Sequence, residues 1–165
     1  MKKLRCAVIG LGMGQGHVQG YQEHSGCEVV AVVDSNQEKL DAYVAEHHIK
    51  HGFTDADEML KQVKPDLVSI AVPNKFHKPL TLAALAAGCH VLCEKPMAMN
   101  AAEALEMEAA AKKAGRRLAI NFSSRFSPQA FAMKKLVDEG LLGEVYFARS
   151  VWQRRRGMPD RKSVV

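Results

Sequence analysis

The first 120 residues alternate between short apolar runs and longer amphipathic segments, with short polar or glycine-containing turns between them. The apolar runs span residues 4–9, 28–33, 66–72, 89–93 and 117–121, and a further short strand is expected over 50–53. Runs that are apolar at consecutive positions and rich in β-branched residues predict parallel strands covered on both faces. Because the connections are short and crossovers are right-handed, the pattern predicts an α/β fold with a doubly wound parallel sheet.

Capping residues predict where the helices between these strands begin and end. A side-chain oxygen just before a helix accepts a backbone N–H of its first turn. The predicted starts are Ser35, with Glu38 completing a capping box, then Thr54, Lys78-Pro79, and Asn100 with Glu103. Gly88 and Gly115 predict the ends of the last two helices, and residues 18–24 are expected to form the first helix.

A run of glycines at positions 10, 12, 14 and 16 joins the first apolar run to the first helix. The spacing departs from the G-x-G-x-x-G template, which would need a glycine where this chain has Gln15. The context of strand, glycine turn and helix nevertheless suits the close approach of backbone N–H groups to a diphosphate. We therefore assign Gly10, Gly12, Met13 and Gly14 to dinucleotide binding.

Asp34 follows the second apolar run and lies 20 residues after Gly14. This is the interval expected for a carboxylate that accepts hydrogen bonds from an adenosine ribose, although an acid at this place could instead cap a helix. A carboxylate repels a 2′-phosphate and no arginine follows closely, so NAD is favoured over NADP. Lys39, one turn further on, is expected to be solvated.

Polar segments follow several of the predicted strands. Ligands on a doubly wound sheet bind at the carboxyl ends of its strands. The segments that fall there are the glycine run, Asp34, Pro73-Asn74, Glu94-Lys95-Pro96 and Asn121. Their convergence predicts a Rossmann-type nucleotide site.

The chain changes character after residue 121. Ser127-Pro128 predicts the start of a helix that ends near Gly140, and Glu144–Trp152 alternates like a half-buried strand without a partner. We predict a dinucleotide-binding domain over 1–121 and the beginning of a second, incomplete α/β domain over 122–165.

Charge and cysteine content narrow the possible partners. Residues 1–120 carry 14 basic and 14 acidic side chains, so the net charge of +5 comes from residues 121–165. This placement disfavours a nucleic-acid-binding domain, and Arg154–Arg156 is expected to be a solvated loop rather than a recognition patch. The four cysteines, Cys6, Cys27, Cys89 and Cys93, lack zinc-finger spacing and are expected to be buried free thiols, with no metal site. No apolar run has the length of a membrane span, and no signal peptide is evident, so a cytoplasmic protein is expected.

Several motifs in sequence order resemble the Gfo/Idh/MocA oxidoreductases. They are the glycine run with His17, Asp34, Pro73-Asn74 with His77, Glu94-Lys95-Pro96, Asn121 to Arg125, and Leu142-Gly143-Glu144-Val145. The resemblance extends to about Pro159 and implies a nicotinamide-dependent oxidoreductase acting on a sugar, cyclitol or other polyol. It further implies a second domain that binds substrate and usually forms an oligomer interface, so a homo-oligomer is one expected state.

The same resemblance assigns roles to individual residues. Lys95 corresponds to the family's lysine beside the nicotinamide and the reacting hydroxyl, and Pro96 to the proline that shapes that turn, next to Glu94. Pro73, Asn74 and His77 correspond to part of the cofactor-facing loop. The family's second catalytic motif, an aspartate and a histidine on a helix, has no counterpart, since all seven histidines lie in residues 1–120. We therefore expect a truncated form that binds NAD but is not a competent dehydrogenase alone.

Other interpretations stay open at this point. A non-catalytic nucleotide-binding or protein-interaction module could pair an exposed strand over 145–152 with another chain. DNA binding through the basic tail is the least favoured alternative. His17 is expected to be an ordinary histidine near a helix start, and Asn121 and Arg125 fit either packing or substrate contact.

Overall fold

The structure is a computed structural model that describes residues 2–151 and 153. The chain divides into two compact units, Met1–Asn121 and Phe122–Val165. Trp152 and Arg154–Arg156 lie outside the described residues, so the expectations for them stay predictions.

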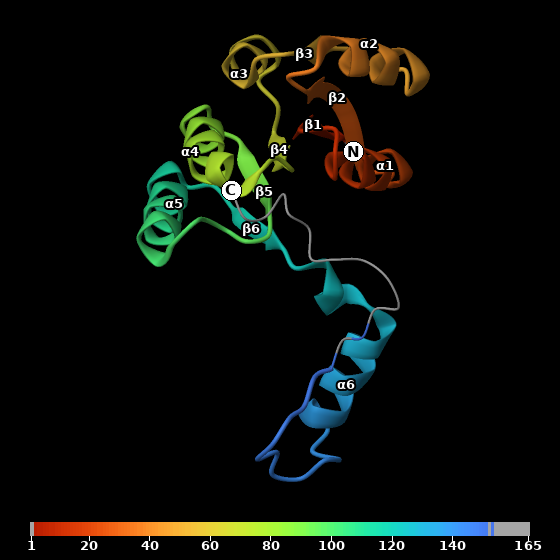
Figure 1. The fold of residues 1–165 in the computed structure, drawn as a ribbon, viewed down its shortest axis with the longest axis vertical. Helices are drawn as coiled ribbons and strands as arrows, with labels where there is room; N and C mark the ends of the chain where they lie inside the picture. The colour runs from red at the N-terminus through yellow and green to blue at the C-terminus, as the bar shows by residue number, and fades with distance from the viewer. Residues whose placement is uncertain (1, 152, 154–165) are drawn as a thin grey trace. The chain divides into compact units, whose positions relative to one another are not determined.

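The first unit is built on a parallel sheet of six strands, which confirms the doubly wound α/β fold (Figure 1). Every adjacent pair is parallel, in the order β3-β2-β1-β4-β5-β6. The strands are β1 (Leu4–Ile9), β2 (Cys27–Val33), β3 (Gly52–Phe53), β4 (Leu67–Ile70), β5 (His90–Glu94) and β6 (Leu118–Asn121).

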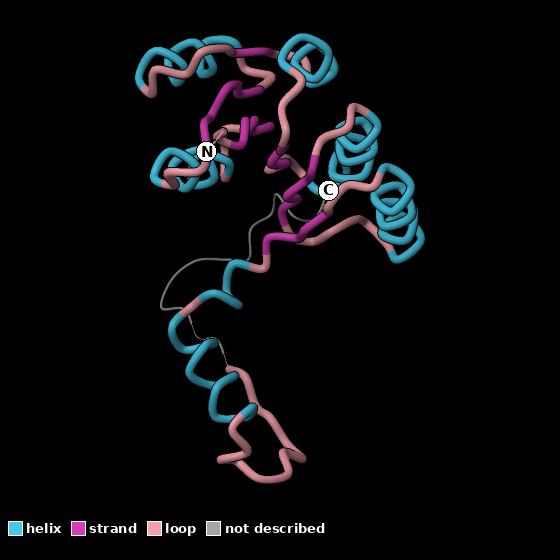
Figure 2. Tube along the Cα trace, turned by 180° about the vertical axis from the view of Figure 1, so that it is seen from behind, coloured by secondary structure: helices cyan, strands magenta, loops and turns pink. Residues whose placement is uncertain are grey.

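Helices cover both faces of this sheet (Figure 2). The helices packed on one face are α1 (Gly14–Glu23) and α2 (Gln37–Glu46). The helices on the other face are α3 (Ala56–Val63), α4 (His77–Ala86), which follows the short 3₁₀ helix η1 (Asn74–Phe76), and α5 (Ala101–Ala114). Along β1, Ala7 and Ile9 face α3, α4 and α5, while Val8 faces α1 and α2. Both faces are therefore apolar, which explains the continuous apolar run in the sequence.

Two helix starts were predicted one residue too early. Helix α2 is capped by Asn36 rather than Ser35, and α3 by Asp55 rather than Thr54. In each case the residue after the predicted cap carries an Asx oxygen that accepts the N3 backbone N–H and takes over the capping position. The caps Asn100 of α5 and Ser127 of α6 (Pro128–Asp138) are confirmed by the same type of hydrogen bond.

The four cysteines are free thiols. Cys6, Cys89 and Cys93 are buried, as predicted, while Cys27 is half-buried. Burial raises the pKa of the Cys6 and Cys93 thiols to about 12, so these thiols stay protonated at neutral pH.

The second unit contains a 3₁₀ helix, η2 (Ser123–Phe126), followed by α6. The described residues 144–151 form no strand, so the strand predicted over Glu144–Trp152 is wrong for them. A lone amphipathic strand has no ladder partner and cannot bury its own apolar side, so the alternation alone does not produce one. No described residue of this unit is buried.

Gly10 generates a test of the fold, because its backbone φ is +93° and a Cβ there would lie 2.4 Å from the carbonyl oxygen of Ala71. We expect Gly10→Ala to lower the free energy of unfolding by about 3 kcal/mol, measured by urea denaturation followed by circular dichroism. The control is Gly20→Ala in α1, where a Cβ meets nothing within 4 Å. That change should raise stability by about 0.5 kcal/mol through helix propensity. Equal denaturation midpoints for Gly10→Ala and the wild type would show that the fold does not require glycine at position 10.

Candidate functional site

The glycine run allows the start of α1 to pack closely against the sheet. A Cβ at Gly10 would collide with Ala71, which directly follows β4, and a Cβ at Gly14 would lie 2.8 Å from Val8 Cγ1 on β1. Helix α1 therefore begins at Gly14, inside the glycine run, and not at residue 18 as expected. The absence of side chains allows this approach, which places the helix N-terminus at the carboxyl edge of the sheet.

The N-terminus of α1 has the properties of an anion site. Its cap residue, Met13, makes no side-chain capping hydrogen bond, and the first turn contains no acid. Gly12 and Met13 are exposed, and a Cβ at Gly12 would meet nothing within 4 Å. An uncapped helix start with open space at Gly12 has the unsatisfied N–H groups and the positive dipole end that favour an anion.

Asp34, at the end of β2, is tied to this loop. Its Oδ2 accepts a hydrogen bond of 2.9 Å from the N–H of Leu11, and its Oδ1 accepts one of 3.1 Å from the N–H of Asn36. Burial raises the pKa of Asp34, but these hydrogen bonds and Lys39 outweigh it and leave the pKa below its ordinary value. Asp34 is therefore a carboxylate that holds the turn before α1.

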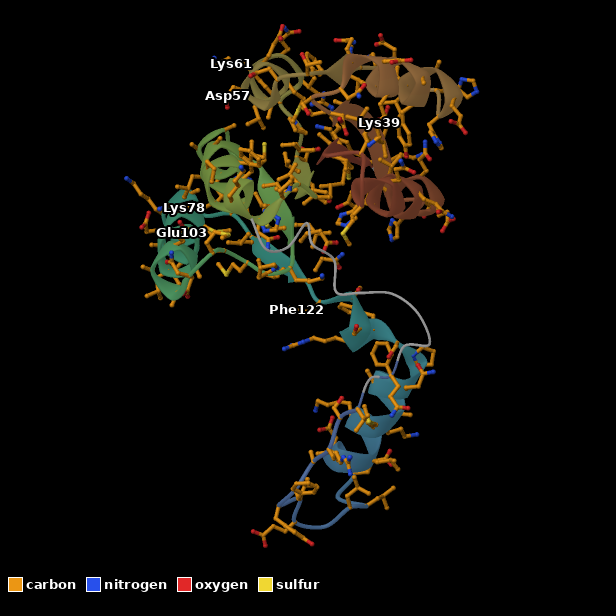
Figure 3. The ribbon with its side chains drawn as sticks, in the orientation of Figure 1. Lys39, Asp57, Lys61, Lys78, Glu103 and Phe122 are labelled. Carbon is orange, nitrogen blue, oxygen red and sulfur yellow. The ribbon has the colours of Figure 1, made fainter. Side chains whose placement is uncertain are left out.

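Lys39 contacts Asp34 instead of being only solvated. Its Nζ lies 3.3 Å from Asp34 Oδ2, while 40% of its side chain remains exposed. Figure 3 labels Lys39 on α2, the helix that follows Asp34 in the chain. The part of the candidate site at the end of β2 thus contains one carboxylate and one partly exposed ammonium group.

Glu94, at the end of β5, is the centre of a buried polar network. Its side chain is 9% exposed, and its Oε1 lies 2.7 Å from Asn121 Nδ2 and 3.0 Å from His17 Nε2. Its Oε2 accepts a 3.2 Å hydrogen bond from the backbone N–H of Lys95. Burial raises the pKa of Glu94, but the donors on Asn121, His17 and Lys95 outweigh it and lower the pKa. The carboxylate thereby joins α1, β5 and β6.

The network continues beneath α1. His17 Nδ1 lies 3.1 Å from Ser69 Oγ on β4, and Ser69 Oγ lies 2.6 Å from the hydroxyl of Tyr21. An ionised Glu94 only accepts, so Nε2–H of His17 donates to it. In the neutral ring, Nδ1 then accepts from Ser69, and the hydroxyl of Tyr21 donates to Ser69. Burial raises the pKa of Tyr21 to about 12, which keeps this hydroxyl a donor.

The sequence pattern places Glu94 and Asn121 at this edge but does not predict the network that joins them to α1. His17 was expected to be an ordinary histidine near a helix start, and Ser69 and Tyr21 were assigned no role. The available signal was a serine in the otherwise apolar β4, together with polar side chains at positions 17 and 21, one turn apart on the same helix. A hollow of about 380 Å³ adjoins the network and is lined in part by Gly16, Gly20, Leu92 and Asn121.

Lys95 and Pro96 are exposed and joined by a cis peptide bond. The loop after β4 lies near them, because His77 bridges the two segments. Its Nδ1 is 2.7 Å from the carbonyl oxygen of Pro96 and its Nε2 is 2.9 Å from that of Val72. His77 itself is fully buried, whereas Pro73 is exposed and Asn74 half-buried.

The predicted site residues of the first unit thus gather at the carboxyl ends of β1, β2, β4, β5 and β6. Arg125 belongs to the second unit, where its guanidinium lies 5.5 Å from the ring centroid of Phe122. Within the described residues, no cluster of three or more His, Cys, Asp or Glu side chains could hold a metal ion. In the same residues, no helix has the length and apolar character needed to cross a membrane.

Comparison with known proteins identifies the family. Residues 4–122 match the oxidoreductase family with an NAD-binding Rossmann fold, Gfo/Idh/MocA. The chain belongs to this family. It is 40% identical to D-glucoside 3-dehydrogenase of Escherichia coli over 158 residues. The aligned region covers 94% of this chain and 45% of that protein. It is 30% identical over 153 residues to inositol 2-dehydrogenase of Corynebacterium glutamicum, which covers 91% of this chain and 45% of that protein.

Solved structures agree with this assignment. The scyllo-inositol dehydrogenase from Lactobacillus casei with bound NAD(H) and scyllo-inositol superposes with a TM-score of 0.82 at 26% identity, over 87% of this chain and 43% of that one. The WlbA dehydrogenase from Bordetella pertussis in complex with NADH and UDP-GlcNAcA gives 0.83 at 29% identity, over 88% and 45%. The chain therefore spans less than half the length of these relatives.

NAD is the cofactor of this family's Rossmann fold, and the residues present here fit it. The uncapped start of α1, the open space at Gly12 and the ionised Asp34 match its diphosphate and its ribose. Which of the predicted residues contact the cofactor stays a prediction.

The lowered pKa of Glu94 predicts how stability depends on acid. Its contribution is complete above the ordinary value of 4.5 and is lost as the pH falls through the lower folded-state pKa. We expect the free energy of unfolding to fall below pH 4.5, by up to about 1.4 kcal/mol per pH unit from this group. Glu94→Gln should flatten this slope, whereas Glu28→Gln, at an exposed position on β2, should not. Urea denaturation between about pH 3 and 6 measures both, and equal slopes for all three proteins would contradict the assignment.

Proposed function

We propose that this chain is the NAD-binding part of an oxidoreductase acting on a secondary alcohol of a sugar, cyclitol or related polyol. The observation that carries the proposal is the uncapped N-terminus of α1, open at Gly12 and flanked by the ionised Asp34. The relatives named D-glucoside 3-dehydrogenase and inositol 2-dehydrogenase support the substrate class.

Each segment at the carboxyl ends of the strands would bind a different part of the cofactor or substrate. The backbone N–H groups of Gly12, Met13 and Gly14 would hold the diphosphate, with Gly10 making the turn that brings them there. Asp34 would accept hydrogen bonds from the adenosine ribose. NAD supplies the hydride chemistry when it is bound.

The other two loops would surround the reacting end. Pro73 and Asn74 lie between β4 and α4, whose first residue is His77, while Glu94 ends β5 and is followed by Lys95 and Pro96. In this proposal Lys95 is the catalytic residue, whose Nζ binds the reacting hydroxyl and takes up or returns its proton. The exposed position of Lys95 leaves its Nζ accessible to a substrate, and the neutral amine is the form that takes up the proton.

We propose that efficient turnover needs substrate-binding groups in addition to the residues of the first unit. The described part of the second unit contributes one α-helix and no strand, and no described residue there is buried. A substrate site needs converging polar groups largely shielded from water, whereas every described residue of this unit is at least partly exposed. We therefore infer that the chain alone binds NAD without efficient catalysis.

The alternative is a nucleotide-binding module that acts through protein contacts. One observation favours it, namely that the second unit exposes Phe131, Leu136 and Leu142. A homo-oligomer or a second domain that covers these side chains is compatible with either function.

Calorimetric titration with NAD tests the proposed function, and we expect saturable binding by the 165-residue chain. Incubation with NAD and a panel of polyols should produce no NADH absorbance above background. Absence of binding at millimolar NAD would overturn the cofactor role, and robust turnover would overturn the inferred dependence on further residues.

Gly12→Val tests the diphosphate position. A side chain at Gly12 meets no protein atom within 4 Å at its Cβ, so the fold should persist, but it would fill the space proposed for the diphosphate. We expect NAD affinity to fall by about 30-fold or more, or about 2 kcal/mol, with an unchanged unfolding midpoint. Gly20→Ala, further along α1, is the control and should bind NAD like the wild type.

Asp34→Asn tests the choice of cofactor. The amide keeps an oxygen that accepts from the glycine loop but removes the charge that repels a 2′-phosphate and leaves Lys39 unneutralised. We expect weaker NAD binding, stronger NADP binding and a fall of about tenfold or more in the NAD/NADP affinity ratio, measured by calorimetry. The variant Asp41→Asn, at an exposed position on α2, should leave the ratio unchanged.

A further inference from the structure

The position of Lys95 Nζ is not set by the side chain's own contacts. Lys95 is exposed, and within the described residues its ammonium group makes no ion pair. A flexible four-carbon stem without a partner leaves the ammonium mobile. The turn that carries Lys95 must therefore determine where the group can reach.

His17 holds the residue before Lys95, Glu94, in place. The ring of His17 donates to Glu94, and Glu94 in turn accepts the backbone N–H of Lys95 through its other oxygen. The side chains of His17 and Glu94 are only 7% and 9% exposed. Bonds between charged and polar groups at such low exposure are stronger than on a surface. The Glu94 carboxylate is thus a fixed acceptor for the amide of Lys95.

His77 holds the residue after Lys95, Pro96, in place. Its Nδ1 makes the shorter of its two carbonyl contacts, 2.7 Å to Pro96, and the ring is fully buried. The carbonyl of Val72 lies 2.9 Å from Nε2. A neutral ring carries one N–H and donates to only one of these carbonyls, whereas a doubly protonated ring donates to both. The residue after Lys95 is thereby joined to the loop that follows β4.

We propose that His17 and His77 are positioning residues that fix Lys95 from the two ends of its turn. The inference rests on the proposed role of Lys95 beside the reacting hydroxyl. His17 also lies in the first turn of α1, the helix proposed to bind the diphosphate. The same histidine therefore links the diphosphate end of the site to the residue that handles the proton.

Backbone amide exchange of Lys95, followed by NMR in the absence of NAD, tests the first contact. We expect His17→Leu to speed exchange of this amide by about tenfold or more, because Glu94 loses a donor that orients it. His17→Gln keeps an N–H donor and should restore much of the protection. An unchanged exchange rate in His17→Leu would overturn the role of His17 whether or not the chain binds NAD.

A double-mutant cycle on NAD affinity tests action through Lys95. We expect His77→Leu to weaken binding about tenfold in the wild type but less than about twofold in a Lys95→Met background, with His77→Gln intermediate. Equal losses in both backgrounds would show a general structural role and overturn the proposal for His77. If His77→Leu does not fold, the same cycle with His17→Leu and His77→Gln decides the point. A wild type that binds no NAD refutes the proposed function, while the exchange experiment still decides how the turn is held.

Discussion

The buried carboxylate of Glu94 is the interaction on which the candidate site depends. A charge at 9% exposure is costly unless donors replace the lost water. Three donors do so here, from His17 on α1, from Asn121 on β6 and from the backbone of Lys95. Because each comes from a different segment, the carboxylate is satisfied only when all three segments are in place. The polar network therefore fixes one arrangement of the sheet edge where apolar packing would tolerate several.

Helix α1 is consequently constrained from two directions. Gly10 and Gly14 bring its start into contact with Ala71 and Val8, and the ring of His17 ties its first turn to Glu94. The first constraint is steric and the second is electrostatic, so neither can substitute for the other. Together they orient the N–H groups of the helix start before any ligand arrives, which reduces the ordering cost of binding an anion.

Local patterns in the sequence predicted the strands and most of the helices, because an apolar run or a helix cap depends on only a few neighbouring residues. They misplaced the caps of α2 and α3 by one residue, where two candidate capping side chains are adjacent. They also predicted a strand after residue 143 that would need a partner from elsewhere. The role of His17 was out of reach for a different reason. Its partners Ser69 and Glu94 are 52 and 77 residues away, and only the crossovers of the sheet bring them together.

The groups proposed to bind the cofactor and the exposed apolar side chains of α6 belong to different units of the chain. All groups proposed to hold the cofactor lie within Met1–Asn121, whose sheet buries apolar residues on both faces. Helix α6 has 11 residues, a length that is marginal in water without packing, and its own residues Phe131 and Leu136 are exposed. Burial of these side chains would stabilise the helix, since tertiary packing of an apolar face supplies most of the stability of helices this short.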